Sequence, residues 1–140
     1  RSVDGGPSWE TIEGPYQGSL FGIVAGQQPR HLLVFGLRGH IFRSTDFAES
    51  WDEVKVQTDS GQLEYGLANG SLLDNGDVLI VGHSGTVLRS TDAGLSFSVS
   101  NRADRASLTG VIAGAQGGLI LVGQNGIHLT DANGNDLHAK

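Results

Sequence analysis

The chain has 140 residues, which is enough for one domain with a buried core, and its composition narrows the class of protein. It contains 22 glycines and only 3 prolines, a balance that favours many short strands joined by tight turns over helices. The formal net charge of −6, without any block of Lys or Arg, argues against nucleic acid and against an anionic membrane surface. The absence of cysteine excludes disulfides, thiolate catalysis and cysteine-ligated metals. No apolar run approaches the roughly 20 residues that cross a bilayer, so no membrane insertion is expected.

Taken in chain order, the predicted elements repeat. Each repeat begins with a glycine-containing segment that we interpret as the innermost strand, and an unbroken apolar run that ends in glycine follows it. Such runs fit strands that are covered on both faces. A glycine turn and a third short strand come next. The innermost segments are 20–25, 64–69 and 108–113, the apolar runs are 31–36, 78–82 and 119–123, and the third strands are 39–42, 85–88 and 126–128.

A polar phrase closes each repeat and joins the third strand to a fourth. Its aspartates lie at 4, 46, 92 and 131, so the intervals are 42, 46 and 39 residues, which are typical of propeller blades. The second copy has Ala48 where glycine is expected, and the fourth copy lacks the aromatic residue. The phrase residues are Ser2, Asp4, Gly6 and Trp9, then Ser44, Asp46 and Trp51, then Ser90, Asp92, Gly94 and Phe97, and finally Asp131.

These repeats predict an all-β fold of propeller blades, each a four-stranded antiparallel sheet. We expect the remnant of a blade at 1–12, with its fourth strand at 8–12, followed by three complete blades at 17–56, 62–100 and 107–140. Closed propellers typically have about 4 to 8 blades, so this number would leave an apolar face open at each end. The chain is therefore expected to be part of a longer propeller, or to form a homodimer that completes a ring.

The chemistry of the phrase indicates a structural role. A short Asp side chain at a strand end can accept hydrogen bonds from backbone N–H groups just downstream and hold the loop as an Asx-type turn. The glycine permits positive φ, and the aromatic ring can pack over the hairpin. Asp4, Asp46 and Asp92 are therefore predicted to be structural rather than catalytic.

The pattern Ser-x-Asp-x-Gly-x-x-Trp, complete at residues 2–9, resembles the Asp box of bacterial-neuraminidase-type (BNR) repeats. With Arg-Ser-Thr-Asp preceded by a glycine turn, as at 39–46 and 85–92, the sequence is most similar to the repeats of photosystem II stability and assembly factor-like proteins. This resemblance implies a non-enzymatic propeller that binds a protein partner and helps to assemble a membrane-associated complex, in a periplasmic or otherwise extracytoplasmic compartment. Our candidates for partner contacts are the turn residues Arg38, His83 and Gln124.

The same resemblance leaves a second function open, because several Asp-box propellers are glycosidases: a sialidase-like glycosidase or a glycan-binding protein whose active residues lie mostly in missing blades. Glycoside hydrolysis needs two carboxyl groups, or in sialidases a Tyr with a Glu, and an arginine cluster for the substrate carboxylate. Besides Tyr16, the one suggestive arrangement is Glu64 next to Tyr65 on an expected innermost strand. No catalytic residue is assigned, and the non-enzymatic function is preferred. The arginines outside the phrases are Arg30, Arg38, Arg102 and Arg105.

No cofactor or metal site is predicted. Residues 131–136 place oxygens at alternate positions, as at the start of a calcium loop, but Asp136 stands where glycine is required and the final Glu is missing. We interpret this segment as a polar hairpin turn. The histidines at 31, 40, 83, 128 and 138 follow no ligand spacing.

Overall fold

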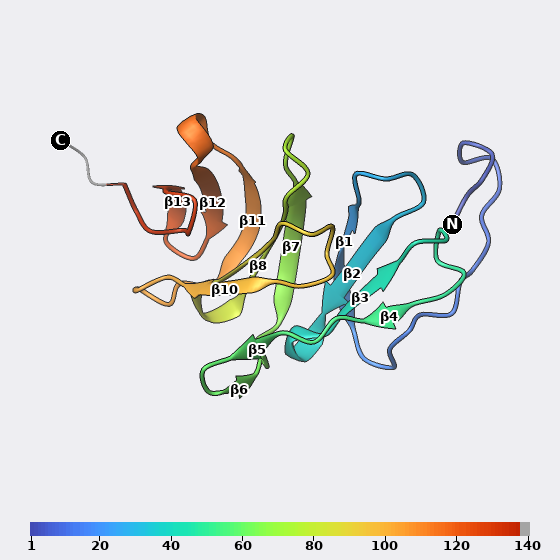
Figure 1. Ribbon diagram of the computed structural model, residues 1–140, viewed down its shortest axis with the longest axis horizontal. Helices are drawn as coiled ribbons and strands as arrows, with labels where there is room; N and C mark the ends of the chain where they lie inside the picture. The colour runs from blue at the N-terminus through green and yellow to red at the C-terminus, as the bar shows by residue number, and fades with distance from the viewer. Residues whose placement is uncertain (138–140) are drawn as a thin grey trace.

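The computed structural model describes residues 1–137 as a row of small antiparallel sheets whose faces pack against one another (Figure 1). Blade 1 contains β1 (Leu20–Ala25), β2 (Leu32–Gly36), β3 (Ile41–Ser44) and β4 (Asp52–Glu53). Blade 2 contains β7 (Leu67–Leu72), β8 (Val78–Gly82), β9 (Thr86–Ser90) and β10 (Ser98–Asn101). Blade 3 contains β11 (Leu108–Ala113), β12 (Leu119–Gly123) and β13 (Gly126–Thr130). The remaining elements are β5 (Gln57–Thr58), β6 (Gly61–Gln62) and the single-turn helices η1 (Leu37–Gly39), η2 (His83–Gly85) and η3 (Ala115–Gly117).

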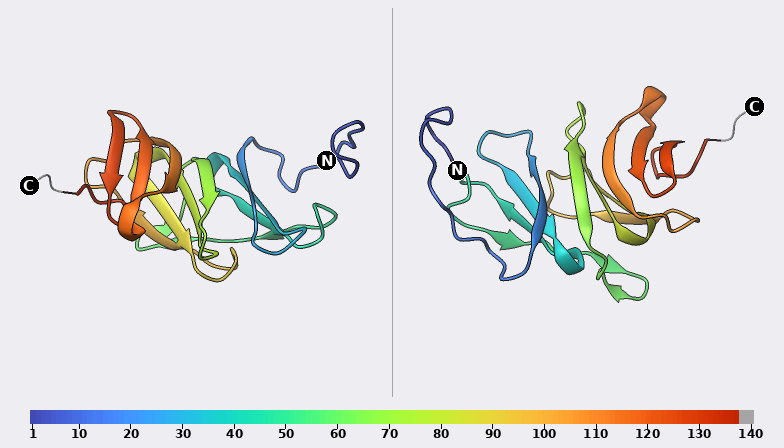
Figure 2. Two further views of the ribbon diagram at one scale, coloured as in Figure 1. Left: turned by 90° about the horizontal axis from the view of Figure 1, so that it is seen from above. Right: turned by 180° about the vertical axis from the view of Figure 1, so that it is seen from behind.

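Each sheet is a simple meander, and β1, β7 and β11 stand side by side as the innermost strands (Figures 1 and 2). The N-terminus lies beyond blade 1, at the opposite end of the row from blade 3. The predicted all-β class and the propeller-like sheets are thus confirmed. Among residues 1–137, no helix is long and apolar enough to cross a membrane.

The hydrophobic core consists of two layers, one at each junction between blades. Strand β8 shows why its apolar run is unbroken, because alternate residues of a strand point to opposite faces. Val78 and Ile80 belong to the layer shared with blade 1, whereas Leu79 and Val81 belong to the layer shared with blade 3. All four side chains are at most 1 % exposed. Blade 2 is therefore held on both faces.

The glycine that ends each second strand is required by close packing of backbones. A Cβ atom on Gly36, Gly82 or Gly123 would lie 2.2, 2.1 or 2.2 Å from a carbonyl oxygen of the residue just before the innermost strand. No side chain can be accommodated at such a distance, because the obstacle is backbone. The same three glycines pair with Leu20, Leu67 and Leu108, which fixes how the blades correspond residue by residue.

This correspondence corrects the predicted innermost strand of blade 2. The strand spans Leu67–Leu72 and not 64–69, since Leu67 pairs with Gly82 just as Leu20 pairs with Gly36. The repeat pattern of the sequence predicts Gly66 at the centre of this strand. Gly66 instead precedes the strand, and Asn69 holds the position that Gly22 and Gly110 hold in blades 1 and 3, so blade 2 has no glycine there to mark it.

The structure also differs from the predicted blades at both ends of the chain, in residues 8–12 and in the last blade. Residues 8–12 form no strand: Ser8 donates to Asp4 and the Glu10 N–H donates to the Arg1 carbonyl at 2.7 Å, but no neighbouring strand extends a ladder. Blade 3 has three strands within residues 1–137, with a single bridge between Thr130 and Asp136 after them. The last part of the predicted blade 107–140, including His138, lies outside the described residues.

Candidate functional site

Three polar turns with identical hydrogen bonding follow the third strands or their equivalent; we call residues 2–8, 44–50 and 90–96 the Ser-Asp turns. In the second turn, the Ser44 hydroxyl donates to Asp46 Oδ1 at 2.8 Å and accepts from the Ala48 N–H at 2.9 Å. Asp46 also accepts from the N–H of Ser50 at 2.9 Å and from its hydroxyl. The other two turns repeat these bonds with Ser2, Asp4 and Ser8, and with Ser90, Asp92 and Ser96.

These hydrogen bonds keep the three aspartates ionised. Donation from the hydroxyl of Ser8, Ser50 or Ser96, the largest cause in each turn, helps to lower the pKa of Asp4, Asp46 and Asp92 to about 2. A general acid needs a pKa near the working pH, so a carboxylate whose oxygens already accept from its own loop is poorly suited to that task. The geometry agrees with a structural role for these residues.

The fourth turn, at Asp131, is built differently. Asp131 Oδ1 accepts from the N–H groups of Asn133 and Asn135 at 2.9 and 3.0 Å, and Asn135 Nδ2 donates to Oδ2 at 3.1 Å. These bonds, with Asn135 first among them, lower the pKa of Asp131. Thr130 replaces the serine, and its hydroxyl donates to the Leu119 carbonyl instead. The segment is a polar hairpin turn whose carboxylate is satisfied by its own loop.

The aromatic residues after the turns do not share one environment. Phe97 packs against the core layer between blades 1 and 2. The indole Nε1 of Trp51 is buried and has no hydrogen-bond partner within residues 1–137. Trp9 is 75 % exposed, so the expectation that each ring packs over its hairpin is wrong for this copy. Its surroundings lack the strands that would cover it.

An arginine ladder joins successive turns. Each arginine that precedes the serine of one turn donates to the carbonyl of the residue after the aspartate in the next turn. Arg1 Nη1 reaches Phe47 O at 2.7 Å, Arg43 Nε reaches Ala93 O at 2.9 Å, and Arg89 Nη1 reaches Ala132 O at 3.2 Å. Leu129 holds the equivalent position in blade 3, so the ladder ends there.

The three candidate partner-facing residues are exposed and lie on equivalent turns: Arg38 within η1, His83 at the start of η2 and Gln124 before β13. His83 and Gln124 occupy the same position, since their N–H groups donate to Gly66 O and Ser107 O at 2.9 and 2.8 Å. Leu37, and not Arg38, is the counterpart in blade 1, because its N–H donates to Ser19 O at 3.0 Å. Arg38 is one residue further along, at φ 57°. Their role in binding a partner stays a prediction.

The residues considered for glycoside hydrolysis are not arranged as a site. Glu64 and Tyr65 precede β7 instead of lying on it, which removes the expected channel-lining pair. Arg102 is 3 % exposed, and its guanidinium binds Asp104 and Asp136, so it is not free to bind a substrate carboxylate. Arg30, Arg38 and Arg105 are exposed residues at positive φ.

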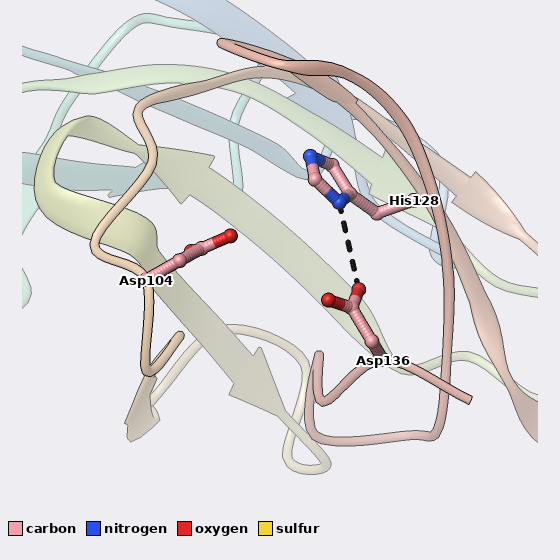
Figure 3. A group of neighbouring side chains, drawn as sticks. All are labelled: Asp104, His128 and Asp136. Atoms are coloured by element: carbon pink, nitrogen blue, oxygen red, sulfur yellow. Dashed lines mark ion pairs between the residues drawn. The ribbon is translucent and has the colours of Figure 1, made fainter. Parts of the chain in front are cut away.

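Three potential metal ligands gather around that same arginine. Asp104, His128 and Asp136 offer ligand atoms within 4.8 Å of one another, and His128 lies 3.5 Å from Asp136 (Figure 3). Arg102 contacts all three, at 2.7 Å to Asp104 Oδ2, 2.9 Å to Asp136 Oδ1 and 3.1 Å to His128 Nδ1. The hydrogen bond from the Arg102 guanidinium is the largest cause that lowers the pKa of Asp104, to about 2. A guanidinium thus supplies the positive charge that a metal ion would bring.

Two larger hollows remain. The first has a volume of about 520 Å³ and lies between the β5–β6 hairpin and strand β10. The second has a volume of about 540 Å³ and is mainly apolar; it lies between residues 9–15 and the outer face of blade 1, where Trp9, Ile23 and Trp51 line it. The first hollow lies between blade 2 and the β5–β6 hairpin in the connection between blades 1 and 2, and the second lies at the end of the row.

The sequence analysis missed two features, although each has a recognisable pattern in the sequence. The serines four residues after each aspartate, Ser8, Ser50 and Ser96, repeat at a fixed offset and complete the turns. The β5–β6 hairpin explains why the interval from Asp46 to Asp92 is 46 residues while that from Asp92 to Asp131 is 39. The longest interval was thus the sign of an insertion.

Comparison with known proteins yields structural likeness only. No family model matches the chain, and no curated protein matches it. A structure of YCF48 from Cyanidioschyzon merolae is 25 % identical, with a TM-score of 0.76, over 90 % of this chain and 41 % of that one. A structure of YCF48 bound to D1 peptide is 22 % identical, with a TM-score of 0.76, over 91 % and 43 %. The chain therefore spans about two fifths of the length of these propellers, and the likeness to YCF48, a photosystem II assembly factor, agrees with the expected class.

Proposed function

We propose that this chain is a portion of a non-enzymatic β-propeller that binds a protein partner and acts as an assembly or stability factor. The observation that carries the proposal is the likeness to YCF48 over nine tenths of the chain, together with the D1 peptide bound in one of those structures. The matched structures lend no support to the glycosidase alternative. A location outside the cytoplasm is part of the proposal and rests on the sequence resemblance alone.

The proposal includes the identity of the repeats. The Ser-Asp turns are Asp boxes of the BNR type, and their function is to hold the third strand to the rim of each blade. The repeated donation from Ser8, Ser50 and Ser96 to the aspartates supports this, because both oxygens of each carboxylate accept hydrogen bonds from within the turn. Partner binding is then left to surfaces that do not repeat.

A homodimer that completes the ring is a separable part of the proposal. Both ends of the row expose apolar side chains, with Ile23 at 61 % on blade 1 and Ile127 at 72 % on blade 3. Light scattering coupled to size exclusion tests it directly. A discrete dimer over about a tenfold range of concentration supports ring completion, and a monomer throughout contradicts it.

Binding of the D1 peptide tests the partner-binding function. A fluorescently labelled D1 peptide, of the sequence held in the YCF48 complex, is titrated with the 140-residue chain while anisotropy is measured. We expect saturable binding and none for a scrambled peptide of the same composition. Equal binding of both peptides, or of neither, contradicts the proposed function.

A further inference from the structure

The β5–β6 hairpin is an insertion in the connection between blades. Thirteen residues, 54–66, connect β4 to β7, whereas only six, 102–107, connect β10 to β11. The core does not require residues 57–62, because Gln57, Asp59 and Gln62 are exposed, whereas the core residues of this connection, Val54, Val56 and Leu63, lie on either side of the hairpin. A loop that adds no core and stands at the rim is a common carrier of function.

The insertion builds one wall of a groove, and blade 2 builds the other. Figure 1 shows the hairpin beside β10, and the hollow of about 520 Å³ between them has the volume of ordinary ligand sites. Residues of both faces of β10, Ser98 and Val99, line the hollow, so the groove runs along the edge of the strand and not over one face. Tyr65, which is 47 % exposed, and Phe97 add aromatic surface.

The edge of β10 presents backbone groups that have no partner. The Arg102 N–H donates to Gly85 O at 2.9 Å, and hydrogen-bonded pairs alternate along an antiparallel ladder. By this alternation, the N–H and C=O groups of Val99 and Asn101 point away from β9. Within residues 1–137 these four groups form no backbone hydrogen bond outside the sheet, and both residues line the groove.

Strand β10 also lacks the features that protect an edge. Exposed edges are usually short, charged or interrupted by proline or a bulge, since they otherwise recruit another strand. Strand β4, the edge of blade 1, is two residues long and both are acidic, Asp52 and Glu53. The sequence of β10 is Ser-Val-Ser-Asn, with neither charge nor proline, and its pairing with β9 has no bulge.

We propose that this groove binds an extended peptide segment, which adds to β10 as a further strand. The inference rests on the proposed function and deepens it, because it assigns the surface that takes the partner. The four residues of β10 pair with a guest strand over about 13 Å. Main-chain hydrogen bonds to Val99 and Asn101 supply register, as in other cases of strand addition.

The lining also defines the chemistry of the guest. Tyr65, Phe97 and Val99 favour an apolar or aromatic side chain on the face toward blade 1. Each wall contributes one charge, Asp59 from the hairpin and Arg105 from the segment after β10, and within residues 1–137 neither forms an ion pair. Balanced charges favour a guest with little net charge, which selects a peptide over a polyanion such as a nucleic acid strand.

The test is an N-methyl scan of a bound peptide, in which the positions that should not affect affinity serve as controls for those that should. Peptides of about a dozen residues are selected from a random phage-displayed library on the 140-residue chain, and the best one is synthesised with N-methyl groups placed one residue at a time. Strand addition predicts loss of affinity by about tenfold or more at every second position and little change between them. Hydrogen exchange of the Val99 and Asn101 amides should slow when the peptide binds.

Each outcome decides the matter. An N-methyl scan without period two, or protection confined to amides other than those of β10, overturns the site while peptide binding itself remains. Failure to select any peptide also overturns the site, and the D1 titration then decides the proposed function independently. A dimer of this chain that protects Val99 and Asn101 without peptide would make a second copy the occupant and would equally overturn the assignment.

Discussion

The Ser-Asp turns and the β5–β6 hairpin, two loop regions of the same chain, obey opposite rules. The turns recur with the same hydrogen bonds in three copies, and their polar atoms form hydrogen bonds within the turn and with the arginine ladder. The hairpin occurs once, packs only its flanking Val56 and Leu63 into the core, and leaves polar groups and strand edges beside a groove. In a repeat protein of this kind, what repeats stabilises the scaffold, and what does not repeat is where recognition can be added.

The largest effect we expect is a loss of folding stability at low pH, caused by the aspartates of the repeated turns. The pKa of Asp4, Asp46 and Asp92 is about 2 in the folded chain against an ordinary 3.8. A group with a lowered folded pKa stabilises the fold above its unfolded pKa, so this stability is present above about pH 4 and lost as the pH falls toward about 2. Denaturant unfolding measured at stepped pH checks it. The free energy of unfolding should depend less steeply on pH in an Asp92→Asn variant. An unchanged dependence would show that the hydrogen bonds to Asp92 do not form.

Removing a turn hydroxyl should cost less but still be clear. Ser90 is 1 % exposed, donates to Asp92 and accepts from the Gly94 N–H, so Ser90→Ala leaves a buried donor without its acceptor. We expect a loss of about 1–3 kcal/mol in the free energy of unfolding. Thr91→Ala, an exposed neighbour in the same turn, is the matched control and should change it by less than about 0.5 kcal/mol. Equal effects of the two variants would contradict the account of the turn.

The arginine ladder predicts a smaller loss. Arg43→Leu gives blade 1 the residue that Leu129 provides in blade 3, and it removes the hydrogen bond to Ala93 O. The expected cost is about 1 kcal/mol in chemical denaturation. Arg38→Leu changes an exposed arginine on another turn and serves as the control. If both variants are equally stable, the ladder contributes nothing to the packing of successive turns.

One substitution should improve the repeated region. Ala48 has φ 74°, whereas the other two turns place Gly6 and Gly94 there at φ 107° and 84°. Ala48→Gly relieves left-handed strain and should raise the free energy of unfolding by about 0.5–1 kcal/mol. Ala132→Gly, in the fourth turn and without a positive φ, should not stabilise. Destabilisation by Ala48→Gly would show that the strain at this position is absent in solution.

The sequence predicted the repeated parts well, because their periodic spacing and steric requirements are written in residue types. Gly36, Gly82 and Gly123 mark the close approach of two backbones, and the apolar runs mark strands with two covered faces. The start of β7 was misplaced because blade 2 has Asn69 where blades 1 and 3 have Gly22 and Gly110, and only pairing with β8 shows that Gly66 precedes the strand. The Arg102 cluster and the groove could not be predicted, since they join residues from different segments and depend on how the blades stack.

Shortening the hairpin tests the central claim, that the repeated turns hold the fold while the inserted hairpin serves binding. The Leu63 N–H donates to Val56 O at 2.9 Å, so residues 57–62 can be replaced by Asn-Gly, which closes the same ladder with a tight turn. We predict a free energy of unfolding within about 1 kcal/mol of the parent chain and a loss of about tenfold or more in affinity for the library-selected peptide. Unchanged affinity, or a variant that no longer folds, would contradict this division between scaffold and binding surface.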